Sequence, residues 1–318
     1  MPKVSIITTT YKHEKFISQT IESILNQTFS DWELLIGDDN GPDKTYEVAL
    51  EYSKKDPRIK VWKHKNNLGI VGNTNFLLSK VSIESEYIAF LEGDDLFIPD
   101  NLEKKLGIFN KFPEVGLVYN NLDFINDRGE VIATNILKKA PFYLKNSKLT
   151  KEQLIKYETF YVSYSTLMFR KDILLKEKIN NPTDDKLYSV SDWDLFFRIS
   201  TMYNCYGIED SMTLYRRHAG NLSGQYLKLF NDLEIQITEY LKNGFIDKKL
   251  FDYKLAFIYI LRAVAYLEIM DRKNSVGCII KSLKISPLSN LYYKVGILGI
   301  NILPGFLIKK ILNIFIKR

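Results

Sequence analysis

Strand-like and helix-like segments alternate over the first 120 residues, and this alternation constrains the fold more than any other feature of the sequence. The strand-like segments are apolar or β-branched runs at 4–10, 32–37, 58–65, 87–91 and 115–120. The segments between them have helical periodicity, as in 14–27, where the apolar residues fall on one face. Strands joined by helices of this length pair in parallel through right-handed crossovers. The sequence therefore predicts an α/β fold with a mainly parallel sheet flanked by helices.

The pattern loosens after residue 120 and changes again near residue 225. Residues 124–134 predict a hairpin, 163–170 a strand, 191–203 a helix capped by Ser191, and 212–224 a last strand and loop. A capping box of Asp100 and Glu103 is also predicted. From 225 onward only helical patterns follow. We therefore predict an α/β domain over 1–224 and an all-helical appendage over 225–287, with a helix hairpin that turns at Asp271–Asn274.

Charge is unevenly distributed along the chain. The net charge is +6, yet no acidic residue follows Asp271, whereas nine Lys and Arg do. Residues 1–271 thus carry 35 basic against 38 acidic residues, a net of −3, which argues against a body that binds nucleic acid. The segment 288–318 is mostly apolar with a basic end, and its longest uncharged run, 295–308, is too short to span a bilayer. This tail predicts a segment that lies at an anionic membrane interface; a C-terminal helix buried on the body is the alternative.

The two cysteines, Cys205 and Cys278, form no spacing pattern, and the N-terminus lacks the features of a signal peptide. We therefore expect a cytoplasmic protein, peripheral at the inner face of the membrane if the tail binds lipid.

Polar residues follow three of the expected strands. Strand 4–10 leads into Thr9, Thr10 and Tyr11, strand 32–37 into Asp38 and Asp39, and strand 87–91 into Glu92, Asp94 and Asp95. In an open parallel sheet, ligands bind outside the carboxyl ends of the strands. Clustered carboxylates there indicate a divalent cation, and a cation beside an aromatic ring suits a nucleoside diphosphate. The glycine-rich patterns of dinucleotide dehydrogenases and of P-loop NTPases do not occur in the sequence.

Five segments, in order, resemble blocks of family 2 glycosyltransferases, which are inverting enzymes of the Rossmann-like GT-A fold. They are the opening 4–40, "NNLGIVGNTN", "FLEGDDLF", "SDWDLFFRIS" and "YRRHAGNLSG", so the resemblance covers residues 1 to about 224. It implies that Thr9, Tyr11, Asp39, Asn67 and Asp94 bind the nucleotide. It also implies that Asp95, with Asp94 and His218, holds Mg²⁺ or Mn²⁺, and that Asp192 is the catalytic base.

The chemistry of inverting transfer also calls for such a base, because a carboxylate must take the proton of the acceptor hydroxyl. Asp192 begins a helix after a loop, and Asp194 is its rival. Two residues depart from the family pattern: Glu92 stands where Asp is usual, and Ser191 where Glu is frequent.

These observations predict a metal-dependent, inverting glycosyltransferase. It would move a sugar from a nucleoside diphosphate sugar, UDP-sugar above all, to a hydroxyl of a surface-glycan precursor that is lipid-linked. The alternatives are a catalytically inactive nucleotide-sugar-binding module of a glycan assembly complex, which the two departures allow, and a nucleotidyltransferase, which the lack of a glycine-rich phosphate loop after the first strand disfavours.

Overall fold

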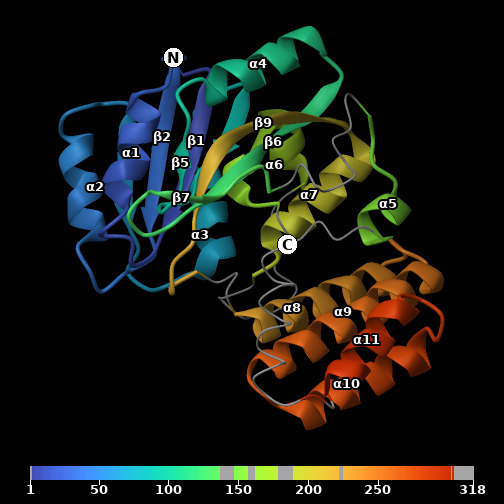
Figure 1. The fold of residues 1–318 in the computed structure, drawn as a ribbon. Coiled ribbons are helices and arrows are strands. Elements are labelled where there is room, and N and C mark those ends of the chain that lie inside the picture. Colours follow the sequence, from blue (N-terminus) through green and yellow to red (C-terminus); the bar gives the residue numbers. More distant parts are fainter. Residues whose placement is uncertain are drawn as a thin grey trace. The chain divides into compact units, whose positions relative to one another are not determined.

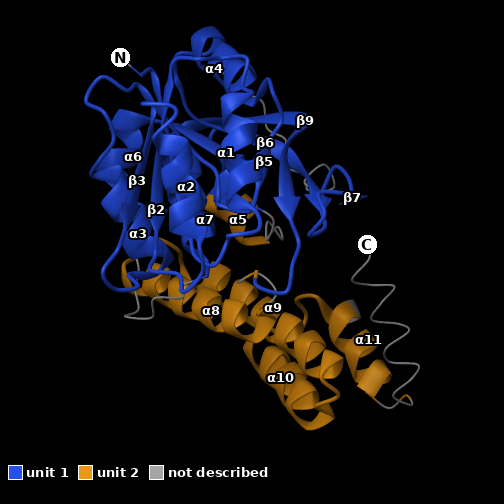
Figure 2. Ribbon diagram, turned by 90° about the vertical axis from the view of Figure 1, so that its left-hand side faces the viewer, with its two compact units in different colours: residues 1–150, 157–220 blue, residues 151–156, 221–318 orange. Residues whose placement is uncertain are grey.

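The computed structural model describes residues 2–136, 147–156, 162–177, 189–221, 225–301 and 303. Contacts divide the chain into two compact units, coloured separately in Figure 2. The larger unit comprises 1–150 and 157–220, and the smaller unit comprises 151–156 and 221–318. The larger unit thus ends at Gly220, whereas the sequence predicts a boundary at 224.

The larger unit is the α/β part of the chain (Figure 1). Its elements are β1 (Val4–Thr10), α1 (Ile17–Leu25), β2 (Trp32–Asp38), α2 (Thr45–Ser53), β3 (Ile59–Lys63), α3 (Gly69–Leu78), β4 (Tyr87–Phe90), β5 (Leu96–Phe97), α4 (Asn101–Lys111), β6 (Val115–Ile125), β7 (Val131–Ala133), β8 (Leu167–Arg170), α6 (Lys171–Glu177), α7 (Ser191–Met202) and β9 (Asn204–Arg216). The alternation expected for the first 120 residues is present, and the predicted fold class is confirmed.

Among the described residues the strands form one mixed sheet in the order β3-β2-β1-β4-β8-β6-β9-β5, with β7 paired to β6. The pairs β1–β2, β2–β3 and β1–β4 are parallel, as predicted. Beyond β4 the sheet changes character, because β8 lies antiparallel between β4 and β6. The hairpin predicted over 124–134 is also present, as the antiparallel pair β6–β7.

Both faces of the central strands are buried. Val4 and Ile6 of β1 belong to a cluster that includes Ile21 of α1 and Leu106 of α4. Ile7, on the opposite face of β1, is 1% exposed. A strand that is buried on both faces has apolar residues at successive positions rather than at alternate ones, which explains the sequence of β1.

Asp100 is the N-cap residue of α4, as predicted, but the predicted capping box is absent, and the predicted cap of α7 is wrong. The Asp100 side chain makes no capping hydrogen bond to α4; its carboxylate lies 3.0 Å from Lys104 Nζ instead. Glu103 accepts from the Thr28 hydroxyl rather than from the helix terminus. At α7 the N-cap is Val190, and Ser191 is already inside the helix. For both helices the local sequence pattern predicted the position of the N-terminus to within one residue, but not the side-chain contacts made there.

The smaller unit is helical where it is described, as the pattern from 225 onward predicts. It contains α5 (Lys151–Lys156), α8 (Tyr226–Lys242), α9 (Lys248–Glu268), α10 (Arg272–Ile285) and α11 (Leu291–Asn301). Asp271 caps α10 by accepting from Asn274 N–H, so the hairpin turns just before the predicted Asp271–Asn274. No described helix is both long and apolar enough to cross a bilayer.

Part of the tail packs within the smaller unit. Lys294 of α11 is buried, and its ammonium donates to Ser282 O and Ser286 O at the end of α10. Asn301 Nδ2 donates to Ser275 Oγ. Leu288 and Val295 are 84% and 60% exposed, and residues 304–318 lie outside the described residues. In its described part, the predicted membrane segment therefore has side chains buried against α10 and exposed apolar side chains.

Candidate functional site

The polar residues predicted from three strand ends meet at one edge of the sheet. Because β1, β2 and β4 run parallel, their carboxyl ends lie together, with Thr10 opposite Asp38 and Ile7 opposite Phe90. The loops that follow are bonded to one another, since Asp39 N–H donates to Thr10 O and Gly93 N–H donates to Thr9 O.

We call the first group of site residues the β1–β2 corner: Thr9, Tyr11, Asp39 and Asn67. Asp39 is 4% exposed, and its two carboxylate oxygens accept from Leu68 N–H at 2.6 Å and Gly69 N–H at 2.9 Å. Asn67 Nδ2 donates to Asp39 O. These bonds fix the start of α3 against the end of β2, so Asp39 is held in place before any ligand arrives.

Tyr11 is the exposed member of this corner. Its ring is 40% exposed, and Lys12 Nζ lies 5.0 Å from the ring centroid. Lys12 has φ 63°, a left-handed conformation that costs a non-glycine residue about 1–3 kcal/mol. Strain of this kind is frequent at ligand-binding sites, and here it lies next to the exposed Tyr11 ring.

The second group, the β4 corner, comprises Glu92, Asp94 and Asp95 with His13 and His218. Asp95 is 0% exposed, and its oxygens accept from Ser165 Oγ at 2.6 Å and Arg216 N–H at 2.8 Å. Its carboxylate is therefore occupied by the protein. The sequence favours Asp95 as the metal ligand, and this stays a prediction; the contacts make Asp94 the better candidate.

Asp94 faces two imidazoles. His218 Nε2 lies 2.9 Å from Asp94 Oδ2, and His13 Nε2 lies 3.8 Å from the same oxygen. The ligand atoms of the three side chains all lie within 4.8 Å of one another. His13 comes from the loop after β1, Asp94 from the loop after β4, and His218 from the segment after β9. Three distant stretches of sequence therefore converge on one point.

The charges of the β4 corner perturb one another. Burial by itself would raise the pKa of Asp94, but the charge of His13 and the hydrogen bond from His218 outweigh burial, so its pKa is lowered. The pKa of Glu92 is raised well above its usual value by burial and then by Asp94, Asp95 and Asp192. Asp192 thus belongs to the same electrostatic cluster.

Asp192 lies in the first turn of α7. Burial raises the pKa of its carboxyl group to about 7, although the Trp193 N–H donates to Oδ1 at 2.7 Å. A carboxylate with a pKa near the working pH is suited to take up a proton. Its rival Asp194 is buried and bonded to Arg198, with Nη2 at 3.0 Å and Nε at 3.1 Å. The contacts therefore favour Asp192 as the base.

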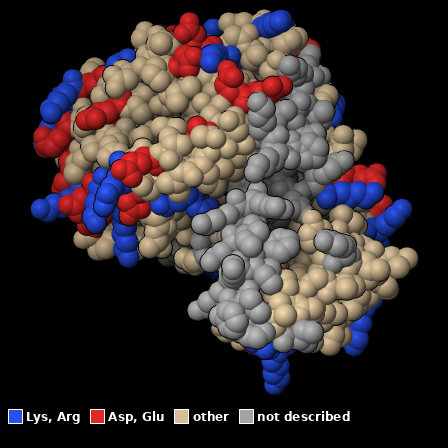
Figure 3. Space-filling view, viewed as in Figure 1, with Lys and Arg blue, Asp and Glu red and all other residues tan. Residues whose placement is uncertain are grey.

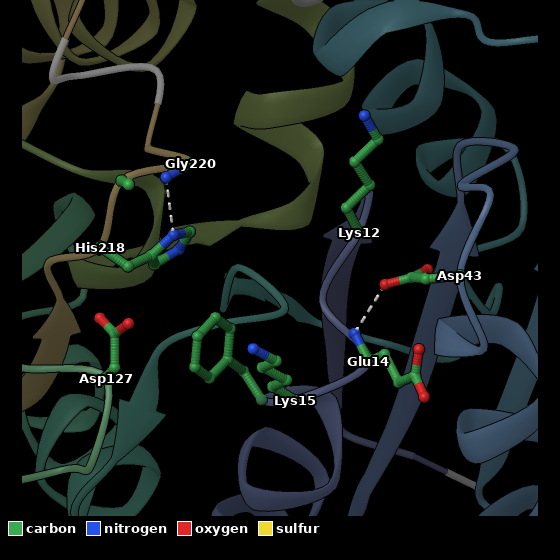
Figure 4. A pocket seen from close by; sticks show the side chains of 9 residues that line it. Lys12, Glu14, Lys15, Asp43, Asp127, His218 and Gly220 are labelled. Carbon is green, nitrogen blue, oxygen red and sulfur yellow. Dashed lines mark hydrogen bonds between the residues drawn. The ribbon is translucent and has the colours of Figure 1, made fainter.

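The residues present fit a divalent cation. The corner combines a carboxylate with two imidazoles, and His13 Nδ1 is a buried polar atom with no hydrogen-bond partner in the described residues. An open pocket of about 350 Å³ adjoins this cluster. Figure 4 shows His218 on one side of this pocket and Lys12 and Lys15 on the other. Glu14, Asp43 and Asp127 also line the pocket, so charges of both signs lie along the approach to His218.

Several residues of the site were missed by the sequence analysis. Arg216 is fully buried; Nε donates to Asp94 O at 2.8 Å, and Nη2 donates to Gln19 Oε1 at 2.8 Å. Asp38, which the sequence analysis names at the end of strand 32–37 without giving it a role, is buried; burial raises its pKa to about 6, and Oδ2 accepts no hydrogen bond from the described residues. His13 gave no usable signal either. Only the position of Arg216 and His218 in one short block, two residues apart, hinted at a shared role.

Acidic and basic side chains are interspersed on the face drawn in Figure 3. This distribution agrees with the near-neutral charge of residues 1–271 and differs from the basic stripe typical of nucleic-acid-binding proteins.

Comparisons with known proteins give the family of the chain. Residues 5–176 match the model of the family described as "Glycosyl transferase family 2". The chain is 32% identical over 220 residues to the uncharacterized glycosyltransferase MJ1057 of Methanocaldococcus jannaschii, covering 68% of this chain and 71% of the relative. It is 27% identical over 249 residues to the O-antigen biosynthesis glycosyltransferase WbnJ of Escherichia coli, covering 75% of this chain and 89% of WbnJ.

A shorter match is more informative about chemistry. The chain is 38% identical over 128 residues to WfgD of Escherichia coli, a UDP-Glc:α-D-GlcNAc-diphosphoundecaprenol β-1,3-glucosyltransferase, covering 40% of this chain and 49% of WfgD. Among solved structures, the fold resembles TarS 1–349 of S. aureus in complex with UDP-GlcNAc, with a TM-score of 0.64, 17% identity, and coverage of 89% and 81% of the two chains. The mannosyltransferase PcManGT of Pyrobaculum calidifontis, in complex with GDP-Man and Mn²⁺, gives a TM-score of 0.57, 15% identity, and coverage of 89% and 75%.

Proposed function

Because this chain belongs to glycosyl transferase family 2, and so is a glycosyltransferase of glycan biosynthesis, we propose that it transfers a sugar from a nucleoside diphosphate sugar with inversion at the anomeric carbon. UDP-sugar is the proposed donor. The printed names of WfgD and of the TarS complex, which contain UDP-Glc and UDP-GlcNAc, support this choice.

The β1–β2 corner would bind the nucleoside. Tyr11 offers an exposed ring on which a base can stack, Asp39 is bonded to the neighbouring residue Thr10, and Asn67 is bonded to Asp39. Asp39 is already positioned by two backbone N–H groups, and its remaining lone pairs can accept from a base N–H. This corner is therefore pre-organised, which lowers the entropic cost of binding.

The β4 corner would hold Mn²⁺ or Mg²⁺ through Asp94 and His218. When bound, the cation neutralises the diphosphate and stabilises the charge on the leaving nucleoside diphosphate. Arg216, donating to Asp94 O, and Ser165, donating to Asp95, keep this loop in place.

Asp192 would act as the base. Its carboxylate takes the proton of the acceptor hydroxyl as the hydroxyl oxygen bonds to the anomeric carbon, and the bond from that carbon to the diphosphate oxygen breaks with its electron pair on oxygen. Attack opposite the leaving group inverts the configuration. The observation that carries this proposal is the convergence of the carboxyl ends of β1, β2 and β4, where Asp94 Oδ2 lies 2.9 Å from His218 Nε2.

The test is a panel of nucleoside diphosphate sugars, each incubated with the full chain with and without Mn²⁺. Release of free nucleoside diphosphate is measured, and the anomeric configuration of any transferred sugar is read by NMR. The proposal predicts metal-dependent release from one donor class and an inverted product. A retained configuration, or equal release without metal, would contradict it.

An inactive nucleotide-sugar-binding module is the second candidate, because Glu92 and Ser191 depart from the family pattern. The same panel separates the two functions. A metal-dependent rise in melting temperature with a donor, together with no nucleoside diphosphate release across the donors and in the presence of glycan acceptors, would favour the module.

The proposed acceptor is a hydroxyl of a lipid-linked glycan precursor, and the enzyme would meet it at the inner face of the membrane. The acceptor in the name of WfgD, a diphosphoundecaprenol-linked sugar, supports this class. The exposed Leu288 and Val295 support binding to anionic lipid, as does the excess of Lys and Arg after Asp271, apart from the buried Lys294.

Vesicle co-sedimentation tests the membrane contact. Binding to vesicles that contain phosphatidylglycerol should fall in the double variant Leu288→Ser/Val295→Ser and in a chain truncated after residue 303. Ile83→Ser is the matched control, because Ile83 is 86% exposed in the larger unit. Unchanged sedimentation of both tail variants would refute the membrane contact and leave the transfer reaction untouched.

A further inference from the structure

His13 completes a cluster that the sequence indicated only in part. Its Nε2 lies 3.8 Å from Asp94 Oδ2, and its ring centroid lies 6.1 Å from that of His218, edge to face. A distance of 3.8 Å is too long for a hydrogen bond, so Asp94 does not hold His13 as it holds His218. A ligand placed between the two imidazoles and Asp94 would contact all three.

The position of His13 is fixed by the backbone rather than by its ring. Its N–H donates to Thr45 Oγ1 at 2.8 Å, and its carbonyl oxygen accepts from Phe16 N–H at 2.8 Å and Ile17 N–H at 2.9 Å. The residue is thus anchored at the start of α1. A side chain anchored in this way, whose ring makes no hydrogen bond to the described residues through Nδ1, is organised for something other than the protein's own stability.

Gly93 brings the ring close to the carboxylate loop. A Cβ on Gly93 would lie 2.7 Å from Thr10 Oγ1 and 2.9 Å from His13 Nδ1. Both of these polar atoms are buried and make no hydrogen bond to the described residues. The absence of a side chain at 93 therefore lets the loop that carries Asp94 approach His13.

We propose that His13 is a third protein ligand of the cation, and that the resulting set of two imidazoles and one carboxylate makes the site select Mn²⁺ over Mg²⁺. The inference rests on the proposed function, because the cation is the one that serves the transfer reaction. Imidazole nitrogen suits transition ions, whereas Mg²⁺ prefers carboxylate, carbonyl and water oxygens in near-ideal octahedral geometry.

The spacing of the three ligand atoms suits this assignment. An ion with bonds of about 2.1 Å separates neighbouring ligand atoms by roughly 3–4 Å. The cluster spans at most 4.8 Å, so a contraction on the order of 1 Å by side-chain rotation is enough. Each oxygen of Asp95 already accepts one hydrogen bond, from Ser165 Oγ or from Arg216 N–H, and rotation of this carboxylate toward an ion would break these bonds.

The test is direct metal binding to the full chain, measured by calorimetry with Mn²⁺ and with Mg²⁺ and no nucleotide. We expect the wild type to bind Mn²⁺ at least about tenfold more tightly than Mg²⁺, and His13→Ala to weaken Mn²⁺ by about tenfold or more while Mg²⁺ changes little. His64→Ala is the control, because His64 Nε2 is paired with Asn73 Oδ1 at 2.9 Å, outside the cluster. If His13→Ala has a lower melting temperature than the wild type, His13→Gln replaces it, because Gln is closer to His in side-chain volume.

Pulsed EPR of bound Mn²⁺ counts the nitrogen ligands independently of affinity. Two imidazole nitrogens are expected in the wild type and one in His13→Gln. Unchanged Mn²⁺ affinity and nitrogen coupling in the His13 variants would overturn the inference while leaving metal-dependent transfer intact. If Asp94→Asn binds neither ion while the His13 variants bind both as the wild type does, His13 is not a ligand, and the inference is likewise overturned. A wild type that binds nucleoside diphosphate but neither ion would overturn both this inference and the metal-dependent part of the proposed function.

Discussion

The two corners of the site differ in how far the protein satisfies its own polar groups. In the β1–β2 corner, each oxygen of Asp39 accepts a backbone N–H, and Asn67 bonds to the Asp39 carbonyl. In the β4 corner, Asp94 faces His218 and a more distant His13 whose Nδ1 is buried without a partner in the described residues. In the first corner the Asp39 carboxylate is hydrogen-bonded without a ligand. In the second corner several carboxylates lie close together, and a bound cation would balance their negative charge. We therefore expect substitutions in the first to cost mainly stability and substitutions in the second to cost mainly binding and turnover.

The largest effect is expected at Asp192. Replacing it with Asn removes the proton acceptor without changing the side-chain volume, so kcat should fall by about 10²–10⁴-fold. Donor binding, measured by calorimetry, should stay within about twofold, because the donor is held by the two corners. An Asp192→Asn enzyme with more than about a tenth of the wild-type kcat would exclude this residue as the base.

A pH profile sharpens the same point. Since burial raises the pKa of Asp192 to about 7, the carboxylate is protonated and inactive below that pH and ionised above it. At saturating Mn²⁺, kcat/KM should rise about tenfold per pH unit below 7 and level off above it. The residual rate of Asp192→Asn should lack this rise, and a wild-type profile flat from about pH 5.5 to 8.5 would contradict the assignment.

Gly93 and Gly107 form a matched pair that probes the packing of the β4 corner. A Cβ on Gly93 would meet Thr10 Cβ at 2.8 Å, whereas nothing lies within 4 Å of a Cβ on Gly107 in α4. Gly93→Ala should lower the free energy of unfolding by about 1–3 kcal/mol and weaken Mn²⁺ binding, because Thr10 and His13 must move. Gly107→Ala should stabilise the protein by about 0.5–1 kcal/mol, as in any helix interior. Equal behaviour of the two variants in urea unfolding would show that the close approach at Gly93 is unimportant.

Asp39 tests the corner that the protein completes by itself. Asp39→Ala leaves the Leu68 N–H without its acceptor and the Gly69 N–H with Asn67 Oδ1 alone, so the free energy of unfolding should fall by about 1–3 kcal/mol even without ligand. The exposed Asp31→Ala is the control and should change stability by less than about 0.5 kcal/mol. A variant at Asp39 that unfolds like the wild type would break the distinction between the two corners.

The smallest effect on turnover is expected at Lys105, a buried charge outside both corners. Its Nζ makes no hydrogen bond to the described residues and lies 5.2 Å from the Phe97 ring centroid, and burial lowers its pKa to about 7. Between about pH 7 and 10 the unfolded chain binds this proton and the folded chain does not, so wild-type stability should rise with pH across that window. Lys105→Met should stabilise the protein by roughly 1–4 kcal/mol at pH 6 and by less at pH 9, with kcat unchanged. A destabilised Lys105→Met at pH 6 would mean that the ammonium has a partner.

The sequence was sufficient for features that depend on local pattern. The alternation through β6, the parallel pairing of β1, β2 and β4, and the presence of carboxylates at their ends follow from short apolar runs and the residues after them. The strand predicted within 212–224 begins eight residues earlier, at Asn204, because pairing with β6 extends β9 through polar positions that carry no strand pattern.

Residues whose role depends on distant partners were not predictable. His13 acquires its neighbours only when β1, β4 and β9 lie in one sheet, since Asp94 is 81 and His218 is 205 positions away. The antiparallel insertion of β8 between β4 and β6 likewise depends on tertiary pairing. The capping box predicted for α4 is absent for a different reason. The local sequence motif is present, but Asp100 pairs with Lys104 and Glu103 accepts a hydrogen bond from Thr28.

The most direct measurement is the anomalous X-ray signal of Mn²⁺ in crystals grown with Mn²⁺ and the nucleoside diphosphate that the donor panel selects. The account predicts one strong peak within bonding distance of Asp94 Oδ2, His218 and His13, with the nucleobase beside Tyr11 and Asp192 across the cavity from the diphosphate. A peak on other residues, or a nucleotide bound away from both corners, would contradict the claim that these strand ends form a single metal-dependent transfer site.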